Sequence, residues 1–375
     1  MLPALFFASL SMLCWLLLLY PYLVYPLVLA RYPRRAVALR PVNLQFSFLF
    51  CVFNEEASIA GKIANLRELK ARTPNLQILV YDDGSTDGTA ELLEQAKGVV
   101  TLVRGEGRRG KAAGMRRLAS LAIGEILVFT DANVLCRPDV IERLAPYYGD
   151  AGVGGVCGTL RYHNEEWSPT AEIGAQYWSI DERLRSLESA TGNVMGADGS
   201  IFSIRRGLYP TFPDTVLDDF VTSMSVVFAG KRLVKAPDVI AYEQSVARAD
   251  EEFRRKIRIG TRAAHTHRWM RERLRTMSRL DRFKYASRKF LRWFGGGFLV
   301  TGIASGLAAL AFISVLASAL AALAGVLGLA IVLVATNGPL AKIGEILRAL
   351  IATQIGVLRG MRGQTVVTWA PAVSR

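Results

Sequence analysis

The chain has 375 residues, with 46 Lys and Arg against 32 Asp and Glu, so its formal net charge is +14. Hydrophobic residues make up 51% of the chain, which excludes an intrinsically disordered protein. Four cysteines, each set singly in an apolar run, exclude a small disulfide scaffold and predict reduced core thiols that face the cytosol.

The first 30 residues contain no charged side chain. The run from Phe6 to Leu29 is long enough to cross a bilayer, which takes roughly 20 apolar residues. Arginines follow at once, beginning with Arg31, and no basic residue precedes the run as it would in a cleaved signal peptide. We therefore expect an uncleaved anchor whose N-terminus faces outward, with the following chain in the cytoplasm.

Short apolar runs alternate with segments of helical spacing between residues 46 and 129. They predict strands and helices in the order β-α-β-α-β-α-β, at Phe46–Val52, Glu55–Lys70, Leu76–Tyr81, Thr89–Ala96, Val99–Val103, Ala112–Leu121 and Ile126–Phe129. This order predicts an α/β domain with a doubly wound, mostly parallel sheet. Such sheets bind ligands beyond the carboxyl ends of their strands, so the polar residues that follow each strand are the candidate site.

A glycine-rich loop with cations, Gly105–Gly110, precedes the helix that begins near Ala112. Its spacing matches the G-x-G-x-x-G of a dinucleotide site, but that fingerprint belongs to the first strand-to-helix turn and this is the third. With Lys111 it nearly matches a Walker loop, but Ala112 stands where that loop needs Ser or Thr. Both interpretations are disfavoured, and a basic loop that meets a phosphate without either fold, or a solvated loop, remains open.

Polar residues directly follow three of the predicted strands. They are Asn54-Glu55-Glu56, Asp82-Asp83-Gly84-Ser85 and Asp131-Ala132-Asn133. Each set alone is also a good turn or helix-cap sequence. In one parallel sheet, however, all three lie at the same edge, which is the place where such sheets bind ligands.

This succession resembles the family 2 glycosyltransferases, membrane-linked inverting enzymes with a GT-A fold that use nucleotide sugars. The resemblance covers about residues 46–262. Its motifs appear here as Phe53-Asn54-Glu55-Glu56, Asp82-Asp83-Gly84, Asp131-Ala132-Asn133, Gly196-Ala197-Asp198-Gly199 and Leu217-Asp218-Asp219-Phe220. It implies a hexosyltransferase that depends on Mg²⁺ or Mn²⁺.

The resemblance implies a role for each motif. The residues that would bind the nucleotide sugar are Phe53, Asn54, Glu55, Asp82, Asp83, Lys111, Asp131 and Asp198. Among them, Asp83 would accept the N3–H of uracil and Glu55 would bond a ribose hydroxyl. Asp131, helped by Asn133, would hold the metal, which neutralises charge on a diphosphate leaving group.

A sugar hydroxyl is a poor nucleophile at pH 7, and a carboxylate within hydrogen-bond reach can take its proton. The resemblance places this base at Asp219, and the neighbouring Asp218 would raise its pKa by like-charge repulsion. One displacement with one base inverts the anomeric carbon. Three further cations would surround the diphosphate or the acceptor: Arg255, Lys256 and Arg258.

The sequence departs from the family pattern at three places. Asn133 replaces a carboxylate, so metal affinity is expected to be weaker unless the diphosphate supplies the missing charge. Leu217-Asp218 replaces Thr-Glu but leaves the base in place. The Gln-x-x-Arg-Trp motif of processive synthases is absent, and residues 255–258 occupy its position with cations only, which argues against processivity.

The stretch from Phe253 to Arg292 holds 15 basic and two acidic residues. Anionic lipid is its expected partner, and nucleic acid is not expected because no stacking-aromatic module accompanies it. The charge-free block Trp293–Ala341 suits two membrane crossings with a turn near Ala317–Ser318. Residues 339–360 then have helical spacing with charges on one face, which predicts an interfacial helix.

The sequence therefore predicts five parts: an anchor (1–30), a GT-A domain (31–245), a basic juxtamembrane region (246–292), two transmembrane helices (293–336) and an interfacial helix with a tail (337–375). The expected activity is transfer from a UDP-sugar to a polyprenyl-linked or polysaccharide acceptor at the cytoplasmic face of a bacterial inner membrane. This reaction would serve exopolysaccharide or cell-surface glycan synthesis, alongside other polysaccharide-assembly proteins. The alternatives are a processive synthase of a β-linked polymer and a non-catalytic membrane scaffold.

Overall fold

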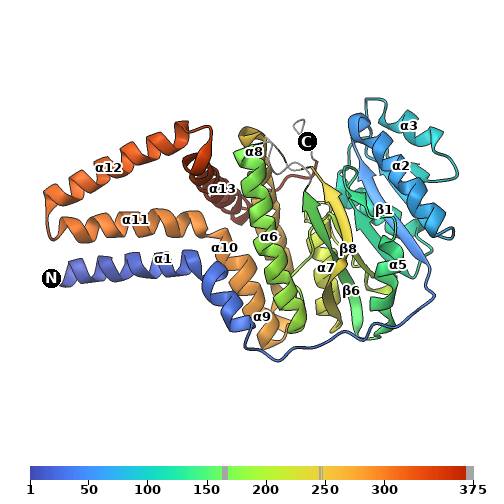
Figure 1. The fold of residues 1–375 in the computed structure, drawn as a ribbon, viewed down its shortest axis with the longest axis horizontal. Coiled ribbons are helices and arrows are strands. Elements are labelled where there is room, and N and C mark those ends of the chain that lie inside the picture. Colours follow the sequence, from blue (N-terminus) through green and yellow to red (C-terminus); the bar gives the residue numbers. More distant parts are fainter. Residues whose placement is uncertain (163–167, 245, 247, 369–375) are drawn as a thin grey trace.

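The computed structural model describes residues 1–162, 168–244, 246 and 248–368. Apolar helices project from one end of the molecule, and a sheet with its covering helices forms the other end (Figure 1). The helices are α1 (Leu2–Leu29), α2 (Glu56–Arg72), α3 (Thr89–Gln95), α4 (Lys111–Leu121), α5 (Val140–Leu144), α6 (Pro169–Ala190), α7 (Asp218–Phe228), α8 (Ala249–Thr276), α9 (Arg279–Tyr285), α10 (Leu291–Trp293), α11 (Gly295–Ala311), α12 (Val315–Val334) and α13 (Gly338–Met361). The strands are β1 (Phe46–Val52), β2 (Gln77–Asp82), β3 (Thr101–Arg104), β4 (Ile126–Thr130), β5 (Leu135–Cys136), β6 (Val153–Tyr162), β7 (Ile201–Arg205) and β8 (Arg232–Glu243).

The strands form one mixed sheet in the order β3-β2-β1-β4-β7-β6-β8-β5. Strands β1 to β4 run parallel, as the alternation of strands and helices predicts. Strand β7 then pairs antiparallel with both β4 and β6, and β5 pairs antiparallel with β8. The α/β fold is therefore confirmed, with a parallel half that carries the first motifs and a mixed half that carries the later ones.

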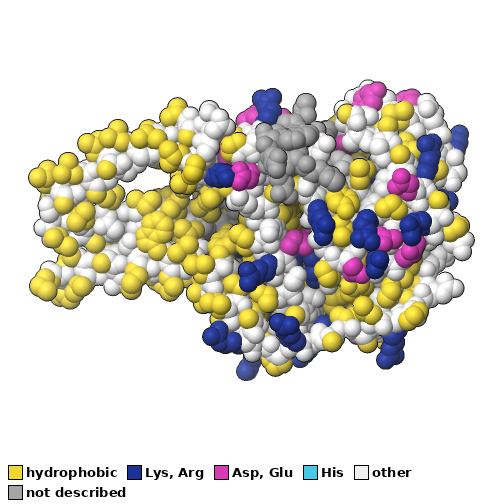
Figure 2. Space-filling model, viewed as in Figure 1, with side chains coloured by type: hydrophobic (Ala, Val, Ile, Leu, Met, Phe, Trp, Pro, Cys, Tyr) yellow, Lys and Arg dark blue, Asp and Glu magenta, His cyan; other side chains and the backbone are white. Residues whose placement is uncertain are grey.

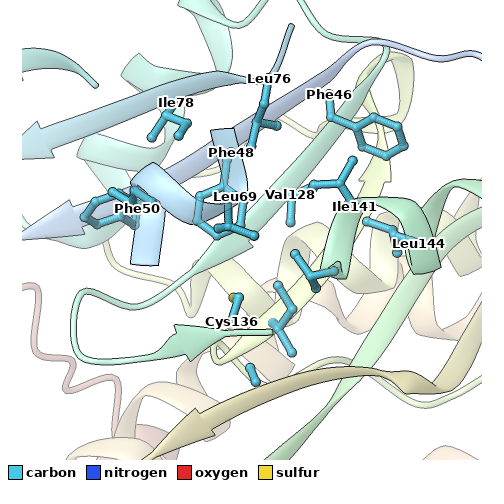
Figure 3. Packing of buried hydrophobic residues seen from close by; sticks show 14 of the residues in the cluster. Phe46, Phe48, Phe50, Leu69, Leu76, Ile78, Val128, Cys136, Ile141 and Leu144 are labelled. Atoms are coloured by element: carbon cyan, nitrogen blue, oxygen red, sulfur yellow. The ribbon is translucent and has the colours of Figure 1, made fainter. Parts of the chain in front are cut away.

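The core lies on both faces of this sheet. Every residue of β1 is buried, because helices cover the strand from both sides. On one face Phe48 and Phe50 join a cluster that includes Leu69 of α2 and Leu144 of α5 (Figure 3). On the other face Leu49 joins a cluster with residues of α4 and α7. The four cysteines are buried free thiols, as expected.

Two helices of the described chain, α1 and α12, are long and apolar enough to cross a membrane, and the bent pair of Arg279–Trp293 with α11 would make a third. Helix α1 lies along α11, and apolar side chains cover this projecting part, whereas charged side chains gather over the sheet (Figures 1 and 2). The turn between the two last apolar helices lies at residues 312–314, before the predicted Ala317–Ser318. The Ser314 hydroxyl accepts from the Ala317 N–H and so caps the start of α12. The predicted turn residues Ala317 and Ser318 therefore lie in the first turn of α12.

The predicted interfacial helix is α13, which lies along α8 rather than standing alone. Glycines allow the two backbones to touch: a side chain on Gly356 would collide with the Ile257 carbonyl, and one on Gly360 with the Thr261 carbonyl. The basic juxtamembrane region is thus packed against α13 over much of its length. Residues of the predicted tail from 369 onward lie outside the described part of the chain.

Buried ion pairs join the sheet domain to the helices that lead to the membrane. Arg288, in a π-helical segment (Ala286–Phe290) between α9 and α10, donates to Glu188 Oε1 at 2.9 Å and to Asp181 at 3.2 Å. Tyr25 of α1 donates to the same Glu188 oxygen at 2.6 Å. Arg292 donates to Asp181 at 2.7 Å. The first apolar helix is therefore fixed to α6 by a buried polar network.

Candidate active site

Three charged side chains converge on Gly199. A Cβ atom on Gly199 would lie 3.1 Å from Lys111 Nζ, 3.3 Å from Asp131 Oδ2 and 3.5 Å from Asp219 Oδ2. Lys111 Nζ also donates to Asp131 Oδ1 at 2.5 Å and lies 4.0 Å from Asp218 Oδ2. The structure therefore places the predicted diphosphate cation, metal ligand and base around one small space that the missing side chain of Gly199 leaves open.

The sheet brings these residues together. Strand β4 pairs with β7 at Thr130 and Ile201, and the Thr130 hydroxyl donates to the Ser200 carbonyl at 2.7 Å, which sets Asp131 beside Gly199. The electrostatic balance favours a charged lysine here. Burial alone would lower the pKa of Lys111, but the negative charges of Asp131, Asp218 and Asp219 outweigh it and raise that pKa.

Side chains of α2 form hydrogen bonds with the backbone of the turn that follows β4. Lys62 is fully buried and donates to the Asp131 carbonyl at 3.1 Å and to the Val134 carbonyl. Asn65 donates to the Cys136 carbonyl at 2.6 Å and accepts from the Cys136 N–H at 2.8 Å. Sequence reasoning missed both residues, because they lie on the apolar face of a helix where spacing alone predicts core.

Asp218 and Asp219 are the first two residues of α7. Asp218 is buried and lies 3.9 Å from Arg262 of α8, whereas Asp219 is half-buried and accepts from the Phe220 N–H at 2.7 Å. Burial and the negative charge of Asp218 raise the pKa of Asp219 to about 6. A carboxylate with this pKa is ionised at neutral pH and is a better proton acceptor than an ordinary one.

The acidic limb of the pH–rate profile is expected to report this pKa. Because the base acts only when it is deprotonated, kcat/KM should fall about tenfold per pH unit below about pH 6. Asp218→Asn removes a like charge, so it should lower the pKa of Asp219 and move the limb to lower pH. Profiles of both proteins, with Glu142→Gln on the surface as control, measure the shift; an unmoved limb in Asp218→Asn would contradict it.

Gly199→Ala is expected to reduce kcat/KM by roughly 10²-fold, because a methyl group there displaces the charged atoms that surround it. The matched control is Gly207→Ala, since nothing lies within 4 Å of a Cβ at Gly207. Neither glycine has a left-handed backbone, so both variants should unfold near the wild-type temperature. Equal activity of the two variants would show that the space at Gly199 is not used.

Asp83 is turned toward the glycine-rich loop. Its two carboxylate oxygens are fully buried and accept from the Arg109 N–H at 2.8 Å and the Gly110 N–H at 3.0 Å. Burial raises the pKa of Asp83, and these two N–H groups oppose that rise. The amides that would cradle a phosphate in a Walker loop are thus occupied, and the loop is fastened to the Asp82-Asp83-Gly84 turn.

Close packing explains two glycines of this loop, Gly105 and Gly110. A side chain on Gly105 would collide with the Tyr81 ring, and one on Gly110 would lie 2.5 Å from the Val367 carbonyl oxygen. Thr365, just before that residue, donates to the Thr215 carbonyl at 2.8 Å. The chain beyond α13 therefore returns to the edge of the candidate site, which no sequence pattern indicated.

The first motif is bound to the second by hydrogen bonds. The Asn54 side chain accepts from the Thr86 N–H at 2.8 Å, and the Glu55 N–H donates to Thr89 Oγ1 at 2.9 Å. The Arg108 guanidinium stacks 3.5 Å from the centre of the Phe53 ring. Asp82 accepts from the Ser85 N–H at 3.0 Å. These residues form one edge of the site, next to the glycine-rich loop.

Other predicted residues pair with protein groups. Asp198 accepts from the Ser200 N–H at 3.0 Å and pairs with Arg185, so its charge joins the buried network of α6. Arg255 and Lys256 both pair with Glu252 at 3.0 Å, one turn earlier in α8. Arg258 lies on the same helix, half-buried. In this structure the Glu252 carboxylate holds two of the three predicted cations.

Asn133 has a partner that sequence reasoning missed. Its Nδ2 donates to Oε1 of Glu243 at 2.9 Å, and Glu243 is a buried residue at the end of β8. A carboxylate at the end of an apolar strand was the signal that identified Asp82 and Asp131, and it applies equally to Glu243. The candidate site therefore includes a fourth strand end, from the mixed half of the sheet.

The oxygen donors fit a hard divalent cation that also binds substrate. Within the described residues no group of three or more His, Cys, Asp or Glu side chains could hold a metal. Asp131 supplies one carboxylate and Asn133 one amide oxygen, and the Lys111 ammonium that contacts Asp131 shows that this carboxylate accepts a cation. Mg²⁺ is commonly bound by one or two carboxylates together with substrate phosphates.

Comparison with known proteins agrees with this geometry. Residues 47–211 match the family model "Glycosyl transferase family 2". An N-acetylglucosaminyltransferase of Rhizobium leguminosarum bv. viciae is 25% identical over 231 residues, which are 56% of this chain and 53% of that protein. A poly-β-1,6-N-acetyl-D-glucosamine synthase of Staphylococcus aureus is 24% identical over 205 residues, 51% of this chain and 48% of that protein. The chain thus spans about half the length of these relatives.

A solved structure has a similar fold over nearly the whole chain. It is the mannosyltransferase PcManGT of Pyrobaculum calidifontis in complex with GDP-Man and Mn²⁺, with a TM-score of 0.74 and 24% identity. The match covers 94% of this chain and 99% of that one, so the likeness of fold extends beyond the sheet domain to the helices that flank it.

Proposed function

Because the chain belongs to glycosyl transferase family 2, we propose that it is an inverting hexosyltransferase that uses a UDP-sugar and a polyprenyl-linked or polysaccharide acceptor. The observation that carries this proposal is the convergence of Lys111, Asp131 and Asp219 on the open space at Gly199. A cation, a metal ligand and a half-buried base within 3.5 Å of one point suit a reaction that expels a diphosphate while a hydroxyl is deprotonated.

In this reaction the acceptor hydroxyl attacks the anomeric carbon of the donor. Asp219 takes the hydroxyl proton on Oδ2 as the new bond forms, and the bond to the diphosphate oxygen breaks on the opposite side of the carbon. Lys111 stabilises the charge that develops on the leaving diphosphate. A single displacement inverts the anomeric carbon, so an α-linked donor gives a β-linked product.

Asp131 and Asn133 would hold Mg²⁺ or Mn²⁺, which when bound withdraws charge from the diphosphate and so makes it a better leaving group. The remaining work falls to the chain itself. Asp83 fastens the glycine-rich loop beside the site, and Lys62 fixes the turn that carries Asp131.

We place the reaction at the cytoplasmic face of a bacterial inner membrane, in the synthesis of a surface polysaccharide. The apolar helices α1 and α12 and the arginines that follow α1 support this placement. The exposed basic residues between Phe253 and Arg292, among them Arg271, Arg275 and Arg279, would meet anionic headgroups, which would hold the site where a lipid-linked acceptor lies.

The test is nucleotide release by the full chain in detergent with Mn²⁺. The donors are UDP-N-acetylglucosamine, UDP-glucose and GDP-mannose, each with and without a polyprenyl-diphosphate sugar. UDP-N-acetylglucosamine is tested first because the names of both relatives contain N-acetylglucosamine. Acceptor-dependent UDP release that Asp219→Asn abolishes is the expected result. Release of GDP alone would mean that the donor is a GDP-sugar and not a UDP-sugar. No release with any donor would contradict the proposal.

A processive synthase is the second candidate, favoured by the Staphylococcus aureus relative named as a polysaccharide synthase. The product distinguishes the two. A single added sugar on each acceptor supports the transferase, whereas a ladder of long products from one donor supports the synthase.

A further inference from the structure

Glu243 lies against the residue at which this chain departs most from its family. The antiparallel pair Leu135–Tyr242 of β5 and β8 brings the residues just before β5 alongside the end of β8. There the Asn133 Nδ2 donates to Glu243 Oε1 at 2.9 Å, and Glu243 is only 9% exposed. The contact is therefore set by the sheet and shielded from water.

This contact decides which end of the amide faces away from Glu243. In this hydrogen bond the amide nitrogen of Asn133 donates and the Glu243 oxygen accepts. The amide nitrogen must therefore face Glu243, and the amide oxygen is directed elsewhere. An amide that rotated by half a turn would set two oxygens against each other and offer to a cation a nitrogen that cannot bind it.

From this geometry we infer that Glu243 is a positioning residue that fixes the Asn133 amide so that its oxygen is offered to the divalent cation. The inference rests on the proposed function, because it takes Asp131 and Asn133 as the metal ligands. It also accounts for the carboxylate that Asn133 replaces. Glu243 supplies a negative charge behind Asn133, as a partner of the ligand and not as a ligand itself. Partners that orient metal ligands in this way typically contribute 10- to 100-fold to metal affinity.

Glu243 also has neighbours on α8 and β6. Arg255 of α8 interacts electrostatically with Glu243, and its guanidinium pairs with Glu252 at 3.0 Å. Tyr162, at the end of β6, is the ladder partner of Glu243. The basic helix that the sequence associates with the diphosphate thus meets the candidate metal site through Glu243.

The test is Mn²⁺ binding to the full chain in detergent with UDP, followed by electron paramagnetic resonance of the free ion. Asp131→Asn, which replaces the one charged ligand by a neutral amide, should bind Mn²⁺ far more weakly than the wild type. Glu243→Ala should bind it roughly 10- to 100-fold more weakly. Glu243→Gln keeps the shape but can donate to the Asn133 oxygen, so it should weaken binding as well. Glu142→Gln, at an exposed ion pair, should bind as the wild type does.

The decisive variant exchanges the two groups. In Asn133→Asp/Glu243→Gln the new amide donates to the new carboxylate, so Mn²⁺ affinity should return to the wild-type value or exceed it. Asn133→Asp alone sets two carboxylates together and should bind less tightly than the double variant. Wild-type affinity in both Glu243 variants, with Asp131→Asn impaired, overturns this inference and leaves the proposed function standing. Undiminished binding in Asp131→Asn overturns the metal site itself.

Discussion

Asp219→Asn is expected to lower kcat by about 10²- to 10⁴-fold, which is the range that a positioned general base contributes. The substitution keeps the shape of the side chain but leaves an amide that cannot take a proton. Asp219 Oδ2 lies 3.5 Å from a Cβ placed on Gly199, and burial together with the charge of Asp218 raises the pKa of Asp219 to about 6.

Kinetics of the purified protein separate this role from a structural one. The KM for the donor should stay within a few-fold of the wild-type value, because Lys111 and Asp131 remain to bind the diphosphate. Asp218→Asn is the matched comparison, since it alters the neighbouring carboxylate in the same helix turn and should retain most activity at neutral pH. Full activity of Asp219→Asn would remove it from the mechanism and favour the non-catalytic scaffold.

Arg288→Met is expected to lower the free energy of unfolding by about 3–5 kcal/mol, because it leaves the buried Glu188 carboxylate without its paired cation, whereas Asp181 keeps Arg185 and Arg292. Arg288 is 1% exposed and contacts Asp181, Glu188 and the Met195 carbonyl. Methionine fills a similar space but cannot donate, so the cost of burying the carboxylate charges is no longer offset.

Thermal unfolding in detergent measures the effect. Arg282→Met, three residues into α9 and exposed, is the matched control and should leave the unfolding temperature nearly unchanged. Adding Glu188→Gln to Arg288→Met removes the carboxylate charge that has lost its cation and should recover part of the loss, as a double-mutant cycle would show. An unfolding temperature equal to that of the wild type in Arg288→Met would mean that the network contributes nothing to stability.

Local patterns predicted the parallel half of the fold well. Strand β1 has the predicted bounds, and β2, β3 and β4 each lie within two residues of them, because short apolar runs between polar turns indicate buried strands. Strands β7 and β8 of the mixed half were not among the predicted elements. Their pairing depends on contacts between distant segments, such as Thr130 with Ile201, and periodicity carries no information about such partners.

The candidate site shows the same division. Motif order places Lys111, Asp131 and Asp219 near one another, and the structure brings them together. Sequence reasoning did not reveal which cations are already paired, so Arg255 and Lys256 were expected at the diphosphate although Glu252 lies one turn before them. Charge along a helix is readable from spacing, whereas the choice among several possible partners depends on packing.

The hydrogen bond from Tyr25 to Glu188 limits which acceptor groups the candidate site can reach. It joins an apolar helix to α6, and α6 carries Arg185, which pairs with Asp198 beside Gly199. Along this path the described residues connect α1 to the pocket through side-chain contacts of α6. With α1 in a bilayer, the pocket would keep one height and one tilt relative to the membrane. We therefore expect the distance between the lipid surface and the base to be fixed. Only acceptor hydroxyls at a set distance from the lipid surface would meet the base, and longer glycans would extend past it.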